Sequence, residues 1–223
     1  MGTRISFPRV DGKKAAGYLA KAGHDHAPGV VVIQEWWGLQ DQIIGMCDRL
    51  ARAGYDALAP DLFAGTVVPY HDSAAAEREV QSLNFHDVVS QVVRGAAQYL
   101  AKSNSKVGIT GFCMGGAVAI MAAQKVPEFV AAISFYSMSM DGPVKAAEVK
   151  VPFQGHYSNS DDYITPIMVN EFEAALHAAK REAAIFRYDA DHAFMNEQRD
   201  VHDRAAAELG WQRMLAFWNR HLR

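Results

Sequence analysis

The stretch that decides the fold of this chain is Gly111-Phe112-Cys113-Met114-Gly115-Gly116. It follows a run with strand character, residues 106–110, and precedes a helical run, residues 117–125. A sharp strand-to-helix turn with glycines around a reactive side chain is typical of a nucleophile elbow. The usual nucleophile there is serine, whereas this chain has Cys113. A thiol in that place indicates covalent chemistry on an electrophile such as an acyl carbon.

The residues around Cys113 fit the demands of such a turn. Ordinary side chains at positions 111 and 115 would clash in the strained backbone, and glycine has no Cβ. Cys113 would then begin a helix, where free N–H groups and the helix dipole favour a thiolate. The N–H of Met114 would be an oxyanion donor. The alternative is that Cys113 is a small buried residue at a close contact between helix and strand.

Composition limits the class of protein. The 223 residues are 50% hydrophobic and 21% charged, which is ample for one core and short for two. A net charge of −3 does not favour nucleic acid or an anionic membrane, and no apolar run approaches spanning length. The first residues lack a secretory apolar core, and the two cysteines, Cys47 and Cys113, are expected to be reduced. We therefore expect a cytoplasmic protein that binds neither nucleic acid nor membrane.

Strand-like and helical segments alternate along the chain. The predicted strands are residues 5–10, 15–20, 29–34, 55–59, 106–110, 129–136, 151–156 and 184–188. The predicted helices are residues 41–53, 73–83, 85–102, 117–125, 166–179 and 205–220. This alternation predicts an α/β fold in which helices cover both faces of a mostly parallel sheet. No repeat or linker interrupts it, so we expect one domain over residues 1–223.

Chemically useful side chains follow several of the predicted strands. Cys113 follows one, the acidic segment 158–162 another, and His192 the last. Ligands bind beyond the carboxyl ends of parallel strands, so these groups should meet at one edge of the sheet. The order Cys, Asp, His is the triad order of an α/β-hydrolase. We expect His192 to act as the general base and either Asp161 or Asp162 to orient its imidazole.

Glu35 directly follows the buried strand 29–34 and precedes two tryptophans. Burial there would favour its protonated form, and near Cys113 it could hold the thiol or receive its proton. The next residue, Trp36, would supply the second oxyanion N–H, because the loop after this strand does so in the fold. No pair of histidines has metal-ligand spacing with a third partner, so no metal site is expected.

At these residues the chain resembles the dienelactone hydrolase family, small cytoplasmic α/β-hydrolases with a cysteine nucleophile. The matching stretches occur in the family's order: Gln34-Glu35-Trp36-Trp37-Gly38-Leu39, Ala59-Pro60-Asp61-Leu62-Phe63, residues 108–116, residues 162–166 and Asp191-His192-Ala193-Phe194. The resemblance implies the α/β-hydrolase fold and hydrolysis of an enol lactone or related ester without a cofactor. It also implies a monomer or weak homodimer.

The resemblance further implies roles for two carboxylates. It selects Asp162, which stands four residues before Pro166 as the family acid does. It also implies that the cysteine rests as a thiol, and that substrate binding shifts Glu35, which then takes the proton. A thiolate made only when substrate is present would be protected from oxidation.

Substrate contacts follow from the same resemblance, with one departure. Family enzymes hold a substrate carboxylate with two arginines, and Arg78 matches the first. The second is expected four residues after the histidine, where this chain has Asn196, which removes a bidentate partner and weakens the case for dienelactone itself. Arg199 is a possible substitute. An apolar pocket for a cyclic or aromatic ester is expected from Trp36, Trp37, Phe63, Tyr136 and Phe194.

The sequence therefore predicts a hydrolase of small lactones or carboxylic esters that works through a Cys-His-Asp triad and a covalent acyl-enzyme. Fold alone does not settle function. A second hypothesis is therefore a weakly active or inactive protein of the same fold that binds a ligand or senses oxidants through its thiol.

Overall fold

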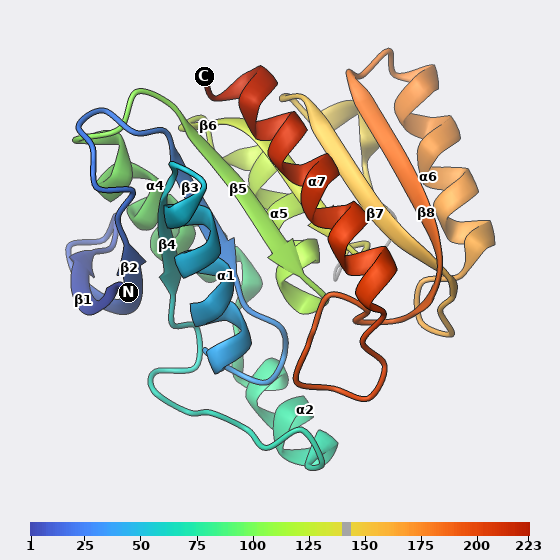
Figure 1. Cartoon of the computed structure of the whole chain (residues 1–223), viewed down its shortest axis with the longest axis horizontal. Coiled ribbons are helices and arrows are strands. Elements are labelled where there is room, and N and C mark those ends of the chain that lie inside the picture. Colours follow the sequence, from blue (N-terminus) through green and yellow to red (C-terminus); the bar gives the residue numbers. More distant parts are fainter. Residues whose placement is uncertain (140–143) are drawn as a thin grey trace.

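The strands of this chain form one eight-stranded sheet in the order β1-β2-β4-β3-β5-β6-β7-β8 (Figure 1). The computed structural model describes residues 1–139 and 144–223. The strands are β1 (Thr3–Pro8), β2 (Lys14–Ala20), β3 (Gly29–Ile33), β4 (Asp56–Pro60), β5 (Val107–Phe112), β6 (Phe129–Phe135), β7 (Phe153–Ser160) and β8 (Ala183–Asp191). The helical segments are α1 (Asp41–Arg52), α2 (Ser73–Ser82), α3 (Phe85–Asp87), η1 (Val88–Val93), α4 (Arg94–Ala101), α5 (Met114–Lys125), η2 (Ala146–Glu148), α6 (Pro166–Ala178) and α7 (Arg204–His221).

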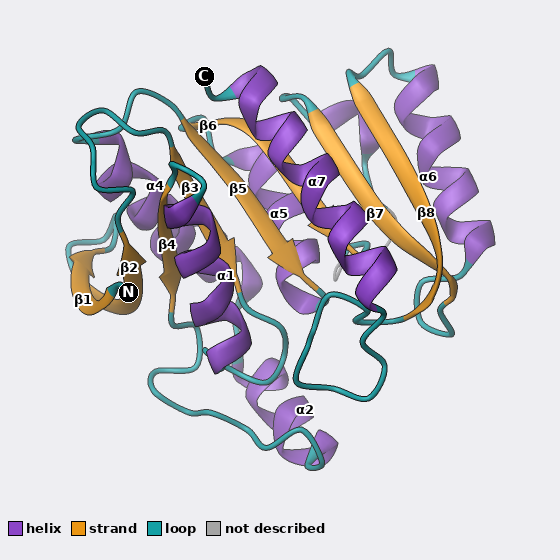
Figure 2. Cartoon of the chain, viewed as in Figure 1, coloured by secondary structure: helices purple, strands orange, loops and turns teal. Residues whose placement is uncertain are grey.

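The parallel part of the sheet runs from β4 through β3 to β8, and β2 joins it antiparallel at β4. Every residue of β3, β4 and β5 is buried, as expected for strands covered on both faces. Helices α1 and α7 cover one face, and α4, α5 and α6 cover the other (Figures 1 and 2). The predicted α/β-hydrolase fold is confirmed.

The structure differs from the predicted elements mainly at strand and helix ends. β7 continues to Ser160, beyond the predicted end at His156, because main-chain pairing with β8 extends through polar residues, as in the pair Ser160 and Asp191. The predicted helix 85–102 contains a π-helical segment, Val88–Val93. No helix among the described residues is long and apolar enough to cross a membrane.

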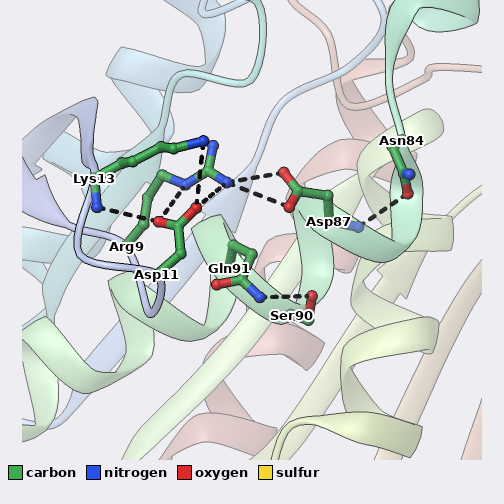
Figure 3. Close-up of polar contacts among 7 residues, drawn as sticks. All are labelled: Arg9, Asp11, Lys13, Asn84, Asp87, Ser90 and Gln91. Carbon is green, nitrogen blue, oxygen red and sulfur yellow. Dashed lines mark hydrogen bonds and ion pairs between the residues drawn. The ribbon is translucent and has the colours of Figure 1, made fainter.

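A polar network fastens the N-terminal hairpin to this π-helical region (Figure 3). The guanidinium of Arg9 bonds to Asp11 within the β1–β2 turn at 2.8 Å and to Asp87 at 3.0 Å. The N–H of Val10 donates to the carbonyl of Gln91 at 3.2 Å. These contacts hold the antiparallel edge of the sheet against α3 and η1.

Candidate active site

Cys113 lies on the sharp turn between β5 and α5. Its backbone has φ 51° and ψ −123°, which places a side chain with a Cβ in a strained region. A Cβ on Gly115 would lie 2.5 Å from the carbonyl oxygen of Gln34, and one on Gly111 would overlap the carbonyl of Gly115. Both glycines are therefore required, and the thiol of Cys113 is partly exposed at the N-terminus of α5.

His192 follows β8 directly, and its Nδ1 lies 2.7 Å from Oδ2 of Asp161. The partner of the imidazole is therefore Asp161, and the prediction of Asp162 is wrong. Asp161 is the first residue after β7 and is buried, with its Oδ1 accepting from the N–H groups of Tyr163 and Ile164 at 2.9 Å each. Asp162 is exposed, so its carboxylate does not take that place.

The charges of this pair favour proton transfer to the imidazole. Burial works to lower the pKa of His192, but its bonds to Asp161 and Cys113 outweigh burial and raise the pKa to about 10. Burial would raise the pKa of the Asp161 carboxyl, yet the bond from His192 and two backbone N–H groups bring it below its usual value. The imidazole is thus a strong proton acceptor next to a thiol.

Aromatic rings hold the imidazole in place from two sides. The rings of Tyr136 and Tyr163 meet His192 edge-on, with centroids 5.1 and 5.4 Å away. Tyr136 has φ 39° and Ala193 has φ 66°, so strained backbone occurs at three non-glycine residues around the thiol, Cys113 among them. Strain of this kind is retained at functional sites because the surrounding packing enforces it.

Two backbone N–H groups border the same space as the thiol. Met114 is the first residue of α5, so its N–H has no acceptor within the helix. Trp36 follows Glu35, and its N–H has no hydrogen-bond partner in the described parts of the chain. Both residues line the cavity beside Cys113. Their role as oxyanion donors stays a prediction.

Glu35 is buried beside the thiol, with 3% of its surface exposed. Its Oε1 accepts from the hydroxyl of Tyr136 at 3.0 Å, and its Oε2 accepts from Nδ2 of Asn196 at 2.8 Å. Burial raises the pKa of Glu35 against the effect of these two donors. Burial also raises the pKa of Tyr136, so its phenol stays protonated as a donor. Asn196 therefore serves Glu35 and does not replace a substrate-binding arginine.

A cavity of about 510 Å³ opens above Cys113 and His192. Its aromatic lining comes from Trp36, Trp37, Tyr136 and Tyr163. Its charged lining, apart from the imidazole, comes from Glu35, Asp162, Asp191 and Arg199. Its size and apolar walls suit a small cyclic or aromatic ligand with few polar groups.

Three predicted substrate contacts do not reach this cavity. Phe63 is buried in the hydrophobic core and does not line the cavity. Arg78 lies exposed on α2 and is absent from the cavity lining. Phe194 is fully buried against Tyr136 and Tyr188, so its ring belongs to the core. The arginine that does line the cavity is Arg199.

Arg199 lies with its guanidinium 5.6 Å from the centre of the Trp37 ring. Within the described ranges, no carboxylate forms an ion pair with it. An unpaired guanidinium facing a cavity is available to an anionic group of a ligand.

Several site residues were not found from the sequence. Tyr163 carried no signal, because an exposed aromatic residue after a strand is common in loops. Tyr70, whose hydroxyl lies 3.4 Å from Nδ2 of Asn196, belongs to a loop with no motif of its own. The residues alone leave Asp161 and Asp162 as alternatives, and the choice between them could have been made by extending β7 through Ser160, which makes Asp161 the first residue of the loop. Among the described residues, no group of three or more His, Cys, Asp or Glu side chains is placed to hold a metal ion.

Comparisons with known proteins agree on one family. Residues 15–222 match the model of the Dienelactone hydrolase family. "Protein usf" of Aquifex pyrophilus is 31% identical over 100% of both chains, and a "Putative carboxymethylenebutenolidase" of Aquifex aeolicus is 30% identical over 100% of both. The crystal structure of a "Putative Dienelactone Hydrolase" from Klebsiella pneumoniae superposes with a TM-score of 0.88 at 30% identity, covering 99% of this chain and 100% of that one.

Proposed function

We infer that this chain, which belongs to the dienelactone hydrolase family, cleaves its substrate through a covalent acyl-enzyme on Cys113. Family membership makes it a hydrolase of the lactone or carboxylic-ester type. The observation that carries the proposed mechanism is the bond of His192 to Asp161 at 2.7 Å beside a thiol on a strained elbow.

In the first half-reaction, His192 takes the proton of the Cys113 thiol. Its Nδ1 is held by Asp161, so Nε2 is the nitrogen that receives the proton. The sulfur forms a bond to the carbonyl carbon, and the carbonyl electron pair moves to oxygen. The N–H groups of Trp36 and Met114 stabilise that oxyanion. Collapse breaks the bond to the leaving oxygen, which receives the proton from His192.

In the second half-reaction, water replaces the thiol. His192 removes a proton from a water molecule, which attacks the thioester carbonyl. The carbon–sulfur bond breaks, the acid leaves, and the thiol regains its proton from His192. For a lactone, the leaving oxygen remains tethered to the acyl group, so the single product is a hydroxy acid or its keto tautomer.

The cavity supports a proposal for the class of substrate. Its aromatic walls favour a cyclic or aromatic ester, and Arg199 is placed to bind an acidic group of that ester. Arg199, which the sequence offered as a substitute for the second arginine, also takes over the role that the resemblance implied for Arg78. A cation–π contact with the Trp37 ring would hold the guanidinium and keep it directed into the cavity.

The experiment compares wild type with Cys113→Ala on short p-nitrophenyl esters and on cyclic enol lactones. The variant should lose at least about 10³-fold in kcat, because no other nucleophile lies at the elbow. Mass spectrometry of the quenched wild-type reaction should detect an acyl adduct on Cys113. Equal turnover by the two proteins would remove Cys113 as the nucleophile.

A further inference from the structure

The carboxylate of Glu35 joins segments that are far apart in the sequence. It lies at the end of β3, and its two oxygens accept from Tyr136 after β6 and Asn196 after β8. Tyr136 and Asn196 are both 0% exposed. Each carboxylate oxygen is therefore occupied by a buried neutral donor.

Asn196 is fixed in turn within the loop that carries His192. Its Oδ1 accepts from the N–H of Gln198 at 3.1 Å, and its own N–H donates to the carbonyl of Ala193 at 2.9 Å. The hydroxyl of Tyr70 bonds to the side chain of Gln198 at 3.0 Å and closes the network on the outside. The bond between Asn196 and Glu35 thus connects the His192 loop to the end of β3.

Leaving this position would be costly for Glu35. If its carboxylate turned to the Cys113 thiol, the hydroxyl of Tyr136 would lose its partner in the interior, and the amide of Asn196 would keep only its longer bond to Tyr70, at 3.4 Å. No Lys or Arg side chain forms an ion pair with Glu35 within the described residues, and His192 and Arg199 act on it only at a distance. An anionic substrate therefore has no ion pair at Glu35 to compete for.

We propose that Glu35 and Asn196 form a fixed clamp that positions the His192 loop, and that Glu35 is not the acceptor of the thiol proton. Asn196 is a positioning residue, and His192 receives the proton directly. This inference rests on the proposed function and replaces the expectation that Glu35 moves when substrate binds.

Exchanging the amide and the carboxylate between positions 35 and 196 distinguishes a clamping role of Glu35 from a proton-accepting role. Glu35→Gln alone keeps an oxygen that accepts from the amide of Asn196 and gains an NH2 group that can donate to the hydroxyl of Tyr136, so it removes the carboxylate and leaves the clamp paired. Asn196→Asp alone places one carboxylate against another. The double variant Glu35→Gln/Asn196→Asp restores one hydrogen bond, because the amide at position 35 donates to the carboxylate at position 196. The double variant has no carboxylate at position 35, so a proton acceptor there would be lost.

The readout is kcat and KM for a neutral p-nitrophenyl ester near neutral pH. Asn196→Asp should lose about 10- to 100-fold in kcat with KM within about twofold, as expected for a displaced catalytic group, whereas Glu35→Gln should stay within about fivefold of wild type. The double variant should recover to within about fivefold of wild type. Glu197→Gln, an exposed neighbour on the same loop, is the matched control and should remain within about twofold.

The pH profile provides a second readout. In Asn196→Asp, two facing carboxylates can share one proton at low pH but repel when both ionise. Its kcat should therefore approach that of wild type at acid pH and fall as the pH rises. If a position-196 variant melts below the assay temperature, Tyr70→Phe replaces it, with a two- to fivefold loss of kcat expected at unchanged KM.

Three results would overturn the clamp: an Asn196→Asp variant as active as wild type, a folded double variant no more active than Asn196→Asp, or a Tyr70→Phe protein with unchanged kcat. A folded Glu35→Gln variant as inactive as Cys113→Ala would show instead that Glu35 accepts the thiol proton. Wild type and Cys113→Ala are assayed alongside. Equal kcat values for wild type and Cys113→Ala would instead overturn the proposed nucleophile. Failure of the clamp can therefore be distinguished from failure of the proposed function.

Discussion

Replacing Asp161 with asparagine tests the assignment of the acid in the site. The change keeps an oxygen that can accept the N–H groups of Tyr163 and Ile164, so the turn after β7 should remain. The new amide group would face Nδ1 of His192 as a donor. The imidazole would then carry its proton on Nε2, which points to the thiol, and could not accept another.

The size of the effect follows from the pKa of His192. A pKa of about 10 instead of 6.5, for a side chain only 18% exposed, corresponds to roughly 5 kcal/mol of stabilisation of the imidazolium. Asp161 and Cys113 both contribute to this stabilisation, and a hydrogen bond to a charged group such as Asp161 is itself worth about 1.5–3 kcal/mol. That alone is ~10²-fold in rate, and the reversed tautomer extends the expected loss in kcat/KM toward ~10⁴-fold.

The assay is the initial rate of hydrolysis of a short p-nitrophenyl ester, with the melting temperature measured for each protein. Asp162→Asn is the matched control, because Asp162 is the exposed neighbour, and it should change kcat by less than about threefold. A larger loss in Asp162→Asn than in Asp161→Asn, with both proteins folded, would refute the assignment.

Three other outcomes are expected. The free energy of unfolding of Cys113→Gly should exceed that of Cys113→Ala by about 1 kcal/mol, because only glycine relieves the strain at φ 51°. Equal melting temperatures of the two variants would show that the turn is unstrained. Gly115→Ala should lower the free energy of unfolding, measured in urea, by more than about 3 kcal/mol, because its Cβ overlaps the backbone of β3. Gly45→Ala should raise it by up to ~1 kcal/mol, because a Cβ there meets nothing nearer than 3.8 Å. The reverse order of stability would contradict the packing. Burial lowers the pKa of His156 to about 3, so its contribution to stability is full above pH 6.5 and is lost as the pH falls toward 3. In His156→Gln, the free energy of unfolding should therefore fall less steeply with decreasing pH, by up to ~1.4 kcal/mol per pH unit. An unchanged slope would show that the imidazole titrates normally.

The sequence predicted the elements and the elbow because both depend on local patterns. Buried strands read as apolar runs, and the glycines at 111 and 115 are required by contacts within the turn and with the neighbouring strand. The placement of the thiol at the start of α5 followed from the same few residues. Local chemistry of this kind does not need knowledge of distant segments.

The contacts across the site could not be predicted in the same way. Asp161 and Asp162 are adjacent and chemically identical, and only the length of β7 and its pairing with β8 decides which one is buried. Whether Arg78 or Arg199 faces the cavity depends on where α2 and the loop after β8 lie. The role of Asn196 required the approach of that loop to β3, which no motif records.

The order of the strands has a consequence for the growing chain. His192 follows β8, which forms the outer edge of the sheet and comes late in the sequence, whereas Cys113 belongs to its middle. A polypeptide emerging from the ribosome therefore carries its sulfur for some time without a base to activate it. Under the proposed mechanism, Cys113 becomes reactive only when the last strand has joined, so unfinished molecules do not form an acyl-enzyme.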